Sequence, residues 1–186
     1  MTGICRAFLR LVMSIKPYYQ DSMEIIDAII SDIKYIDWLR AKESEAVGFI
    51  PKVRYEMEIT GDRGGDILLA KENNDLVGFV YVTYGPPLSA KIQQIVIQED
   101  ARRMERATAL LDEIAKRARN RGCAEIGCRC AEDLEANIFW KSLGFTKVSE
   151  GMGKSVYSRG KAKLGKRGRH INIYRRLSGL YQARLT

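Results

Sequence analysis

Histidine and cysteine are scarce in this sequence, which limits the metal sites it can build. Its 186 residues include one histidine, His170, and four cysteines: Cys5, Cys123, Cys128 and Cys130. No C-x-x-C pair occurs, and Cys128 and Cys130 lie two apart on an expected strand, where closed zinc geometry is difficult to form. A zinc site completed by His170 is the less favoured alternative. We therefore expect no metal, and we interpret the cysteines as buried free thiols in a reducing cytoplasm.

Long hydrophobic runs are also absent. No apolar stretch reaches the ~18–20 residues that a membrane helix needs, so we expect no membrane segment. The short apolar run within residues 1–12 contains two arginines and lacks a small-residue cleavage site, which disfavours a signal peptide. We interpret residues 1–12 as an N-terminal extension and 13–177 as one domain, with translation from Met13 as an alternative. The sequence does not indicate the oligomeric state.

Acidic residues are missing from the C-terminal end. Residues 158–186 contain nine lysines or arginines and no acid, whereas the whole chain has 31 basic and 23 acidic residues. Without that segment 22 basic residues face 23 acidic ones, so the net charge of +8 comes entirely from it. Such a cluster favours RNA or DNA as a partner, and a solvated loop followed by a basic tail, residues 178–186, is the alternative. The predicted nucleic-acid contacts are Lys161, Lys163, Lys166, Arg167 and Arg169.

The stretch with the strongest pattern runs from Ile92 to Leu111. An apolar strand over residues 92–97 is followed by a polar hinge, 98–100, and then by apolar residues at helical spacing. Arg102, Arg103 and Arg106 lie where the helix should start. A helix N-terminus presents unpaired N–H groups and the positive end of its dipole. The joint therefore predicts a site for a phosphate-bearing ligand, and a solvated basic turn is the alternative.

Further elements surround this stretch. A first strand is predicted at residues 13–16, and apolar spacing predicts a helix from Asp21 through Ile33. Two more helices are expected at 36–46 and 51–59, and a hairpin joins 67–70 to 76–82 across Asn73, Asn74 and Asp75. Later come a strand at 124–130, a short helix at 134–142 and a last strand at 170–177. This order indicates a single α/β domain.

Two motifs within this order resemble the GNAT superfamily of N-acetyltransferases. The acyl-CoA loop of that family, R/Q-x-x-G-x-G/A, corresponds to Arg102-Arg103-Met104-Glu105-Arg106-Ala107. Its A-x-x-F-Y-x-x-x-G-F pattern corresponds to residues 136–145, with Trp140 in place of tyrosine. The resemblance covers roughly Ser14 to Leu177 and implies a mixed, mostly antiparallel seven-stranded sheet flanked by helices.

The resemblance also implies a binding site for acetyl-CoA as co-substrate. Backbone groups of the fourth strand would pair with pantetheine, and amides at the helix start would hold the pyrophosphate. The residues implied are Ile95, Val96, Ile97, Arg102, Arg103, Met104, Glu105, Arg106, Ala107, Thr108, Asp133, Ala136, Phe139 and Trp140. Glu105 replaces the central glycine of the loop and places a carboxylate near that phosphate site.

Catalytic groups depart from the family pattern. Gln93 and Gln94 stand where many members carry a carboxylate base; glutamine cannot accept a proton, but Gln93 could hold a water. Trp140 cannot protonate a leaving thiolate, so we assign that role to Tyr157. The resemblance implies an N-acyltransferase, and a nucleic-acid-linked acceptor would account for the basic segment. The alternatives are a catalytically impaired module that binds nucleic acid, and an enzyme acting on a small or protein amine.

Overall fold

Two asparagines shape the hairpin at the centre of the sheet. Asn73 and Asn74 both have positive φ angles, 48° and 76°, as the two central residues of a type I′ turn require. The turn joins β2 (Asp66–Glu72) to β3 (Asp75–Gly85) with Glu72 opposite Asp75. Most of the apolar side chains of both strands are buried. The predicted hairpin is therefore confirmed.

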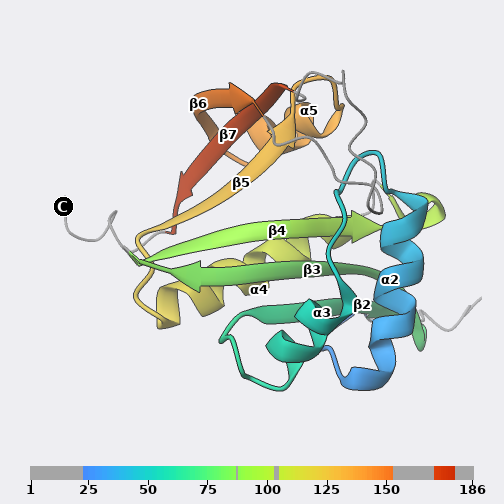
Figure 1. The fold of residues 1–186 in the computed structure, drawn as a ribbon. Coiled ribbons are helices and arrows are strands. Elements are labelled where there is room, and N and C mark those ends of the chain that lie inside the picture. The colour runs from blue at the N-terminus through green and yellow to red at the C-terminus, as the bar shows by residue number, and fades with distance from the viewer. Residues whose placement is uncertain (1–22, 87, 103–104, 153–169, 179–186) are drawn as a thin grey trace, which may run out of the picture.

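Seven strands form one twisted sheet in the computed structural model, which describes residues 23–86, 88–102, 105–152 and 170–178 (Figure 1). The strand order is β1-β2-β3-β4-β5-β7-β6. Only β4 and β5 pair in parallel; every other neighbouring pair is antiparallel. The remaining strands are β1 (Glu24–Asp27), β4 (Ser89–Ile97), β5 (Glu125–Ala131), β6 (Thr146–Met152) and β7 (His170–Leu177). The predicted mixed, mostly antiparallel sheet is confirmed.

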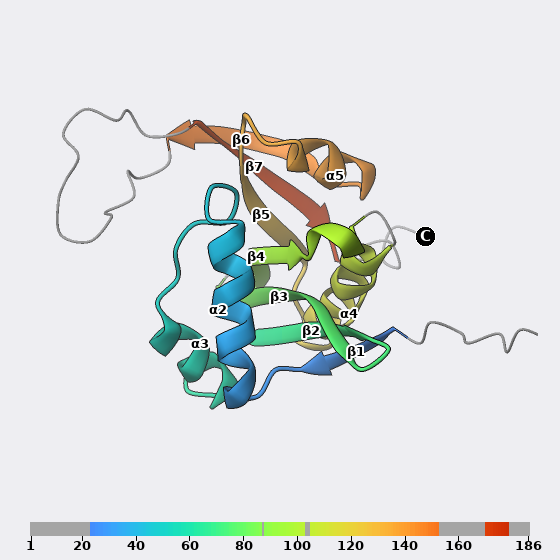
Figure 2. The same ribbon diagram turned by 90° about the vertical axis from the view of Figure 1, so that its right-hand side faces the viewer.

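Helices cover both faces of this sheet and create two cores. On one face α2 (Ile33–Lys42) and α3 (Lys52–Ile59) pack against β2, β3 and the end of β4. On the other, α4 (Arg106–Asn120) buries Leu110, Leu111 and Ile114 against the sheet, and α5 (Ala136–Ser142) adds Trp140. Short 3₁₀ turns, η2 (Ile30–Asp32) and η3 (Glu99–Ala101), lead into α2 and toward α4. Figure 2 shows α2 and α3 on the opposite side of the central strands from α4.

The N-terminal part departs from the predicted helix. Residues 24–27 form β1, in which Ile25 lies opposite Ala70 and Ile26 opposite Leu69 of β2. The helical prediction was wrong there because isoleucines at helical spacing also fit a short strand, and pairing with β2 satisfies the backbone. Helix starts only after Ile29. The extension at residues 1–12 and the strand at 13–16 lie outside the described residues.

The described ranges contain neither a candidate membrane helix nor a candidate metal cluster. None of the helices in the described ranges is long and apolar enough to cross a membrane. Within those ranges no cluster of three or more histidine, cysteine or acidic side chains could hold a metal ion. Cys123, Cys128 and Cys130 are buried free thiols, and burial raises the pKa of Cys123 and of Cys128. Cys123 and Cys128 are therefore protonated core side chains rather than nucleophiles.

Candidate functional site

The two parallel strands separate halfway along their length. The β4–β5 ladder runs from the Ser89–Glu125 pair to Ile92–Cys128 and then stops, although β4 continues to Ile97 and β5 to Ala131. A cavity of about 170 Å³ occupies this opening. Its walls come from β4, β5, the start of α5 and the segment that follows α2. The opening is the place where the sheet leaves backbone groups available to a ligand.

A β-bulge at Gln93 marks the point of separation. Val82 of β3 lies opposite Ile92, and Tyr81 lies opposite Gln94, so Gln93 is the extra residue. Because side chains alternate along a strand, one extra residue exchanges the two faces. Ile92 accordingly belongs to the core under α4, whereas Val96 belongs to the core under α2 and α3. Gln93 lines the cavity and its Nε2 donates to Thr83 Oγ1 at 2.7 Å.

Backbone groups of alternate β4 residues face the opening. The N–H of Gln98 donates to the carbonyl of Val77 in β3. Since peptide groups point alternately to the two sides of a strand, those of Ile95 and Ile97 point away from β3. The carbonyl of Ile97 accepts a 3.3 Å hydrogen bond from Arg102 Nε, which is consistent with that direction. The peptide groups of Val96 are turned toward β3, so the backbone of Ile95 and Ile97 faces the opening, while Val96 itself is among the residues that line the cavity.

An aromatic cluster closes the far wall. Trp140 is buried and makes edge-on contacts with Phe139 and Phe145, with ring centroids 5.2 and 5.1 Å apart. Trp140 and Ala136 line the cavity, whereas Phe139 packs half-buried against the core. Asp133 is exposed in the turn before α5. Trp140 therefore supplies an apolar wall, and its indole has no acidic proton to give.

Asn137 ties that wall to the last strand, a role that sequence reasoning missed. Its Nδ2 donates to the carbonyls of Ala131, Glu132 and Leu134 at 2.8, 3.1 and 2.6 Å. Its Oδ1 accepts from Asn172 Nδ2 and Tyr174 OH, both at 3.0 Å. Burial raises the pKa of Tyr174. One buried amide thus fixes α5 against β5 and β7, and only the fold brings these partners together.

The start of α4 combines an unusual backbone with two differently placed arginines. Glu105 is exposed and has φ 60° and ψ −1°, in the left-handed region. This conformation explains why glycine suits that position. Ala107 and Thr108 lie in the first helical turn and are half-buried, so their N–H groups have no partner within the helix. The predicted contacts Arg103 and Met104 lie outside the described residues.

Arg102 and Arg106 have different surroundings. Arg102, with 44% of its side chain exposed, pairs with Glu43 at 2.5 Å beside the cavity. The side chain of Arg106 is 8% exposed, pairs with Glu72 at the end of β2, and donates to the carbonyl of Ala101 at 3.1 Å. The guanidinium of Arg106 is therefore occupied, and only its backbone N–H remains for a phosphate. Arg102 stays at the predicted site.

Buried tyrosines hold the segment between α2 and α3 against β4. Tyr55 OH donates to Gln94 Oε1 at 2.6 Å, and Gln94 Nε2 donates to the carbonyl of Gly48 at 2.9 Å. Burial raises the pKa of Tyr55. Gln94 therefore serves structure, while Gln93 remains at the opening. Phe49 is 65% exposed next to this anchor, and Ile50 packs on the core.

A buried carboxylate lies under the same segment. Glu58 accepts hydrogen bonds from Tyr81 OH and the Gly65 N–H, both at 2.7 Å, and lies 3.5 Å from Arg63. Burial, followed by the bond to Glu58, raises the pKa of Tyr81 to about 12. Tyr84 similarly donates to Asp66 at 2.6 Å. The tyrosines Tyr81 and Tyr84 fill core and rim positions. No sequence motif links Glu58 to Tyr81.

Several predicted residues fall outside the described part of the chain. Tyr157, the predicted acid, is one of them. The others are the proposed nucleic-acid contacts Lys161, Lys163, Lys166, Arg167 and Arg169. These assignments stay predictions.

Comparison with known proteins agrees with this geometry. The chain resembles the ribosomal-protein-S18-alanine N-acetyltransferase from Escherichia coli (TM-score 0.65, 16% identity, covering 84% of this chain and 94% of that one). It also resembles an acetyl transferase from Salmonella typhimurium that modifies the N-terminal serine of ribosomal protein L7/L12 (0.65, 17%, 84% and 95%). A third similar structure is Ard1 from Thermoplasma volcanium (0.64, 16%, 83% and 97%). No curated protein sequence matches. Residues 23–145 match the model of the acetyltransferase (GNAT) family, and the chain therefore belongs to that family.

Proposed function

We propose that this enzyme transfers an acetyl group from acetyl-CoA to the α-amine of a protein or peptide, in the opening between β4 and β5. The observation that carries the proposal is the one-sided pairing of β4 after Ile92, which leaves the peptide groups of Ile95 and Ile97 facing the cavity. Peptide groups in this position can pair with the amides of a pantetheine arm. We further propose that the enzyme acts in the cytoplasm, as its free thiols suggest.

The residues at the opening fit the co-substrate. Ile95 and Ile97 offer backbone donors and acceptors, and the N-terminus of α4 offers unpaired N–H groups for a phosphate. Arg102 lies beside the opening and Glu105 is exposed rather than buried in it. Acetyl-CoA supplies the acetyl group as an activated thioester.

The chain contributes mainly positioning and polarity to the transfer. A neutral amine must attack the carbonyl carbon as the carbon–sulfur bond breaks, and it must then lose a proton. Gln93 offers its amide oxygen to a water that can receive this proton, since its Nε2 is already bonded to Thr83. Backbone N–H groups in the opening can stabilise the developing oxyanion. Tyr157 remains our prediction for the group that protonates the thiolate.

A protein α-amine is favoured over other acceptors by two considerations. One of the similar structures is named a ribosomal-protein-S18-alanine N-acetyltransferase, and another modifies the N-terminal serine of ribosomal protein L7/L12. The cavity itself is small, and beyond it the sheet face stays open. The terminal amine of a peptide can enter the cavity while the rest of the peptide lies along the open face of the sheet.

Thermal unfolding with increasing acetyl-CoA tests the proposal. A ligand that binds only the folded protein at 100 times its dissociation constant stabilises it by about 2.7 kcal/mol. We expect the melting temperature to rise with acetyl-CoA and to stay unchanged with adenosine alone at equal concentration. Mass spectrometry of an incubated peptide should then show one added acetyl group. Absence of any thermal shift would favour the catalytically impaired module.

The basic C-terminal segment favours a second candidate, an acceptor linked to nucleic acid. If its cations contact phosphates, log affinity should fall with log salt by roughly 0.9 per duplex phosphate, or about 0.7 for a single strand. The test compares wild type with a variant in which Lys161, Lys163, Lys166, Arg167 and Arg169 are neutralised. A flatter slope with unchanged acetyl-CoA binding supports this candidate. Absence of RNA and DNA binding by wild type at moderate salt removes it.

A further inference from the structure

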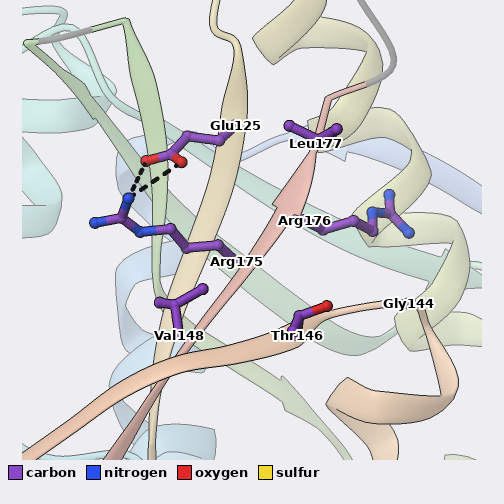
Figure 3. Close-up of a pocket in the computed structure, with 7 residues that line it drawn as sticks. All are labelled: Glu125, Gly144, Thr146, Val148, Arg175, Arg176 and Leu177. Atoms are coloured by element: carbon purple, nitrogen blue, oxygen red, sulfur yellow. Dashed lines mark hydrogen bonds and ion pairs between the residues drawn. The ribbon is translucent and has the colours of Figure 1, made fainter. Parts of the chain in front are cut away.

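One face of the sheet stays open beyond β4. The helices α4 and α5 contact β5 from the side of the larger core, whereas α2 and α3 stop over β2, β3 and the end of β4. Figure 2 shows β5, β6 and β7 extending past α2 and α3. A groove of about 640 Å³ lies at this end, lined among others by Glu125, Arg175, Thr146 and Val148 (Figure 3).

The register brings basic residues of several strands onto this face. Lys91 lies opposite Gly127 of β5, and Gly127 lies opposite Arg175 of β7. Residues opposite one another share a face, as do residues two apart on one strand. Lys91, Arg129 and Arg175 therefore share one face of the sheet, and Arg175 is among the residues that line the groove. Arg129 also lines the cavity between β4 and β5, as does Gln93, two residues after Lys91.

Three of the cations near the cavity have no acidic partner in the described ranges. They are Lys91, Arg129 and Arg54, and we refer to them as the basic cluster. Arg54 donates only a long bond to Tyr81 OH, at 3.4 Å. Nearby carboxylates are engaged elsewhere: Glu43 pairs with Arg102, and Glu125 with Arg175. Arg129 of this cluster lines the cavity, and no ion pair in the described ranges balances the three charges.

The electrostatics of Lys91 show that these charges act on one another. Burial lowers the pKa of Lys91, and the positive charges of Arg129 and then Arg54 lower it further. Like charges held together cost free energy in the unliganded protein, and an anion between them relieves that cost. A polycationic acceptor would add to the repulsion instead.

We propose that the basic cluster binds acidic side chains close to the amine of the acceptor, so that this enzyme acetylates acidic peptide N-termini. The proposal rests on the proposed function and specifies its acceptor. With the amine in the cavity, Lys91 and Arg129 lie within reach of the next residues, since β-strand residues rise only about 3.3 Å each. The groove toward Glu125 and Arg175 leaves room for the chain that follows. Such a groove favours a peptide over a small amino acid.

Acetylation kinetics with matched peptides test this specificity. The peptides share an N-terminal alanine or serine and differ at the second and third positions, which are both aspartate, both alanine or both lysine. We expect the highest kcat/KM for the aspartate peptide and the lowest for the lysine peptide. Arg129→Gln should raise KM for the aspartate peptide about tenfold or more, as for one lost charge-assisted bond, with little change in kcat.

Charge reversal provides the sharper variant. Arg129 is exposed, so Arg129→Glu should fold, and we expect it to prefer the lysine peptide. Lys116→Gln on the exposed side of α4 is the matched control, because Lys116 lies on the other side of the sheet. It should leave the order of the three peptides unchanged.

The outcomes distinguish failure of the acidic specificity from failure of the proposed acetyltransferase function. Equal rates for the three peptides, or unaltered preference in Arg129→Glu, would overturn the acidic specificity while leaving the acetyltransferase intact. A free amino acid such as glutamate acetylated better than the aspartate peptide would also overturn it. If no peptide is acetylated and acetyl-CoA gives no thermal shift, the proposed function itself fails.

Discussion

The two halves of β4 have opposite roles. From Ser89 to Ile92 the strand is paired on both sides, whereas from Gln93 to Ile97 it is paired only with β3. The first half is part of the core and the second forms a wall of the site. The bulge at Gln93 separates them. The opening in the sheet therefore arises from a change in strand pairing.

The same contrast recurs just after the strand. Arg102 belongs to the open part, exposed beside the cavity, whereas Arg106 is enclosed with Glu72. Both arginines come from one motif and look equivalent in the sequence. Variants that change the two parts separately test this contrast.

The largest effect should follow from deleting Gln93. Removal of the bulge residue would turn Gln94 and Val96 toward the wrong core, because a slip of one residue exchanges the faces of a strand. We expect loss of cooperative unfolding, measured by circular dichroism during thermal denaturation. Gln93→Ala, which keeps the bulge, should fold normally and affect only catalysis. A stable deletion variant would refute the bulge as the dividing point.

The next largest effect should be the difference in stability between variants of Arg106 and of Arg102. Arg106→Gln leaves Glu72, whose side chain is 16% exposed, without its partner, and the loss should approach the roughly 3–5 kcal/mol that breaking a buried pair costs. Arg102→Gln breaks an exposed pair and should change the free energy of unfolding by less than about 1 kcal/mol. It should instead weaken acetyl-CoA binding by about 1.5–3 kcal/mol if its guanidinium contacts a phosphate. Urea denaturation and calorimetric titration measure the two quantities, and equal stabilities would contradict the contrast.

Matched isoleucines compare the halves of β4 directly. Ile92 is 4% exposed in the core, whereas Ile95 is half-buried beside the opening. Ile92→Ala should lower the free energy of unfolding by about 2–5 kcal/mol. Ile95→Ala should cost less because part of its surface already meets solvent. Urea denaturation of the two variants side by side would contradict us if Ile95→Ala proved the more damaging.

The smallest effect is expected at Glu105. Glu105→Gly relieves a left-handed conformation that costs a residue with a Cβ about 1–2 kcal/mol, and greater freedom of the unfolded chain offsets part of the gain. We expect a small rise in melting temperature and tighter acetyl-CoA binding, since a carboxylate leaves the phosphate site. Glu105→Ala removes the charge but keeps the Cβ. It should therefore match the glycine variant in binding without matching its stability.

Sequence patterns predicted the parts of this fold that depend on local signals. The hairpin at Asn73-Asn74, the helix after Pro51 and the amphipathic α4 all follow from neighbouring residues. The seven-stranded arrangement came from the family resemblance. The helix predicted from Asp21 through Ile33 is wrong for residues 24–27, because isoleucines at helical spacing also fit a short strand and only pairing with β2 decides between the two structures.

The site was less predictable because its details depend on distant partners. The bulge at Gln93 exists only relative to β3, and the occupied state of Arg106 depends on Glu72, 34 residues away. Asn137 is satisfied by groups from the turn after β5 and from β7. The left-handed backbone of Glu105, by contrast, lies at the position where the family has a glycine. Local motifs therefore located the opening, and tertiary contacts determined which of its residues are free.

The hydrogen-bonded chain from Tyr55 through Gln94 to Gly48 has a consequence for how fast and how selectively the enzyme can work. A segment anchored in this way loses its conformational entropy when the protein folds, before any substrate arrives. Binding then need not supply the roughly 0.5–1.5 kcal/mol per side chain that ordering an interface normally costs. Association should accordingly be rapid and free of a slow closing step. The corresponding disadvantage is a narrow tolerance, because a rim that cannot rearrange will reject acceptors whose first residues do not already match its shape.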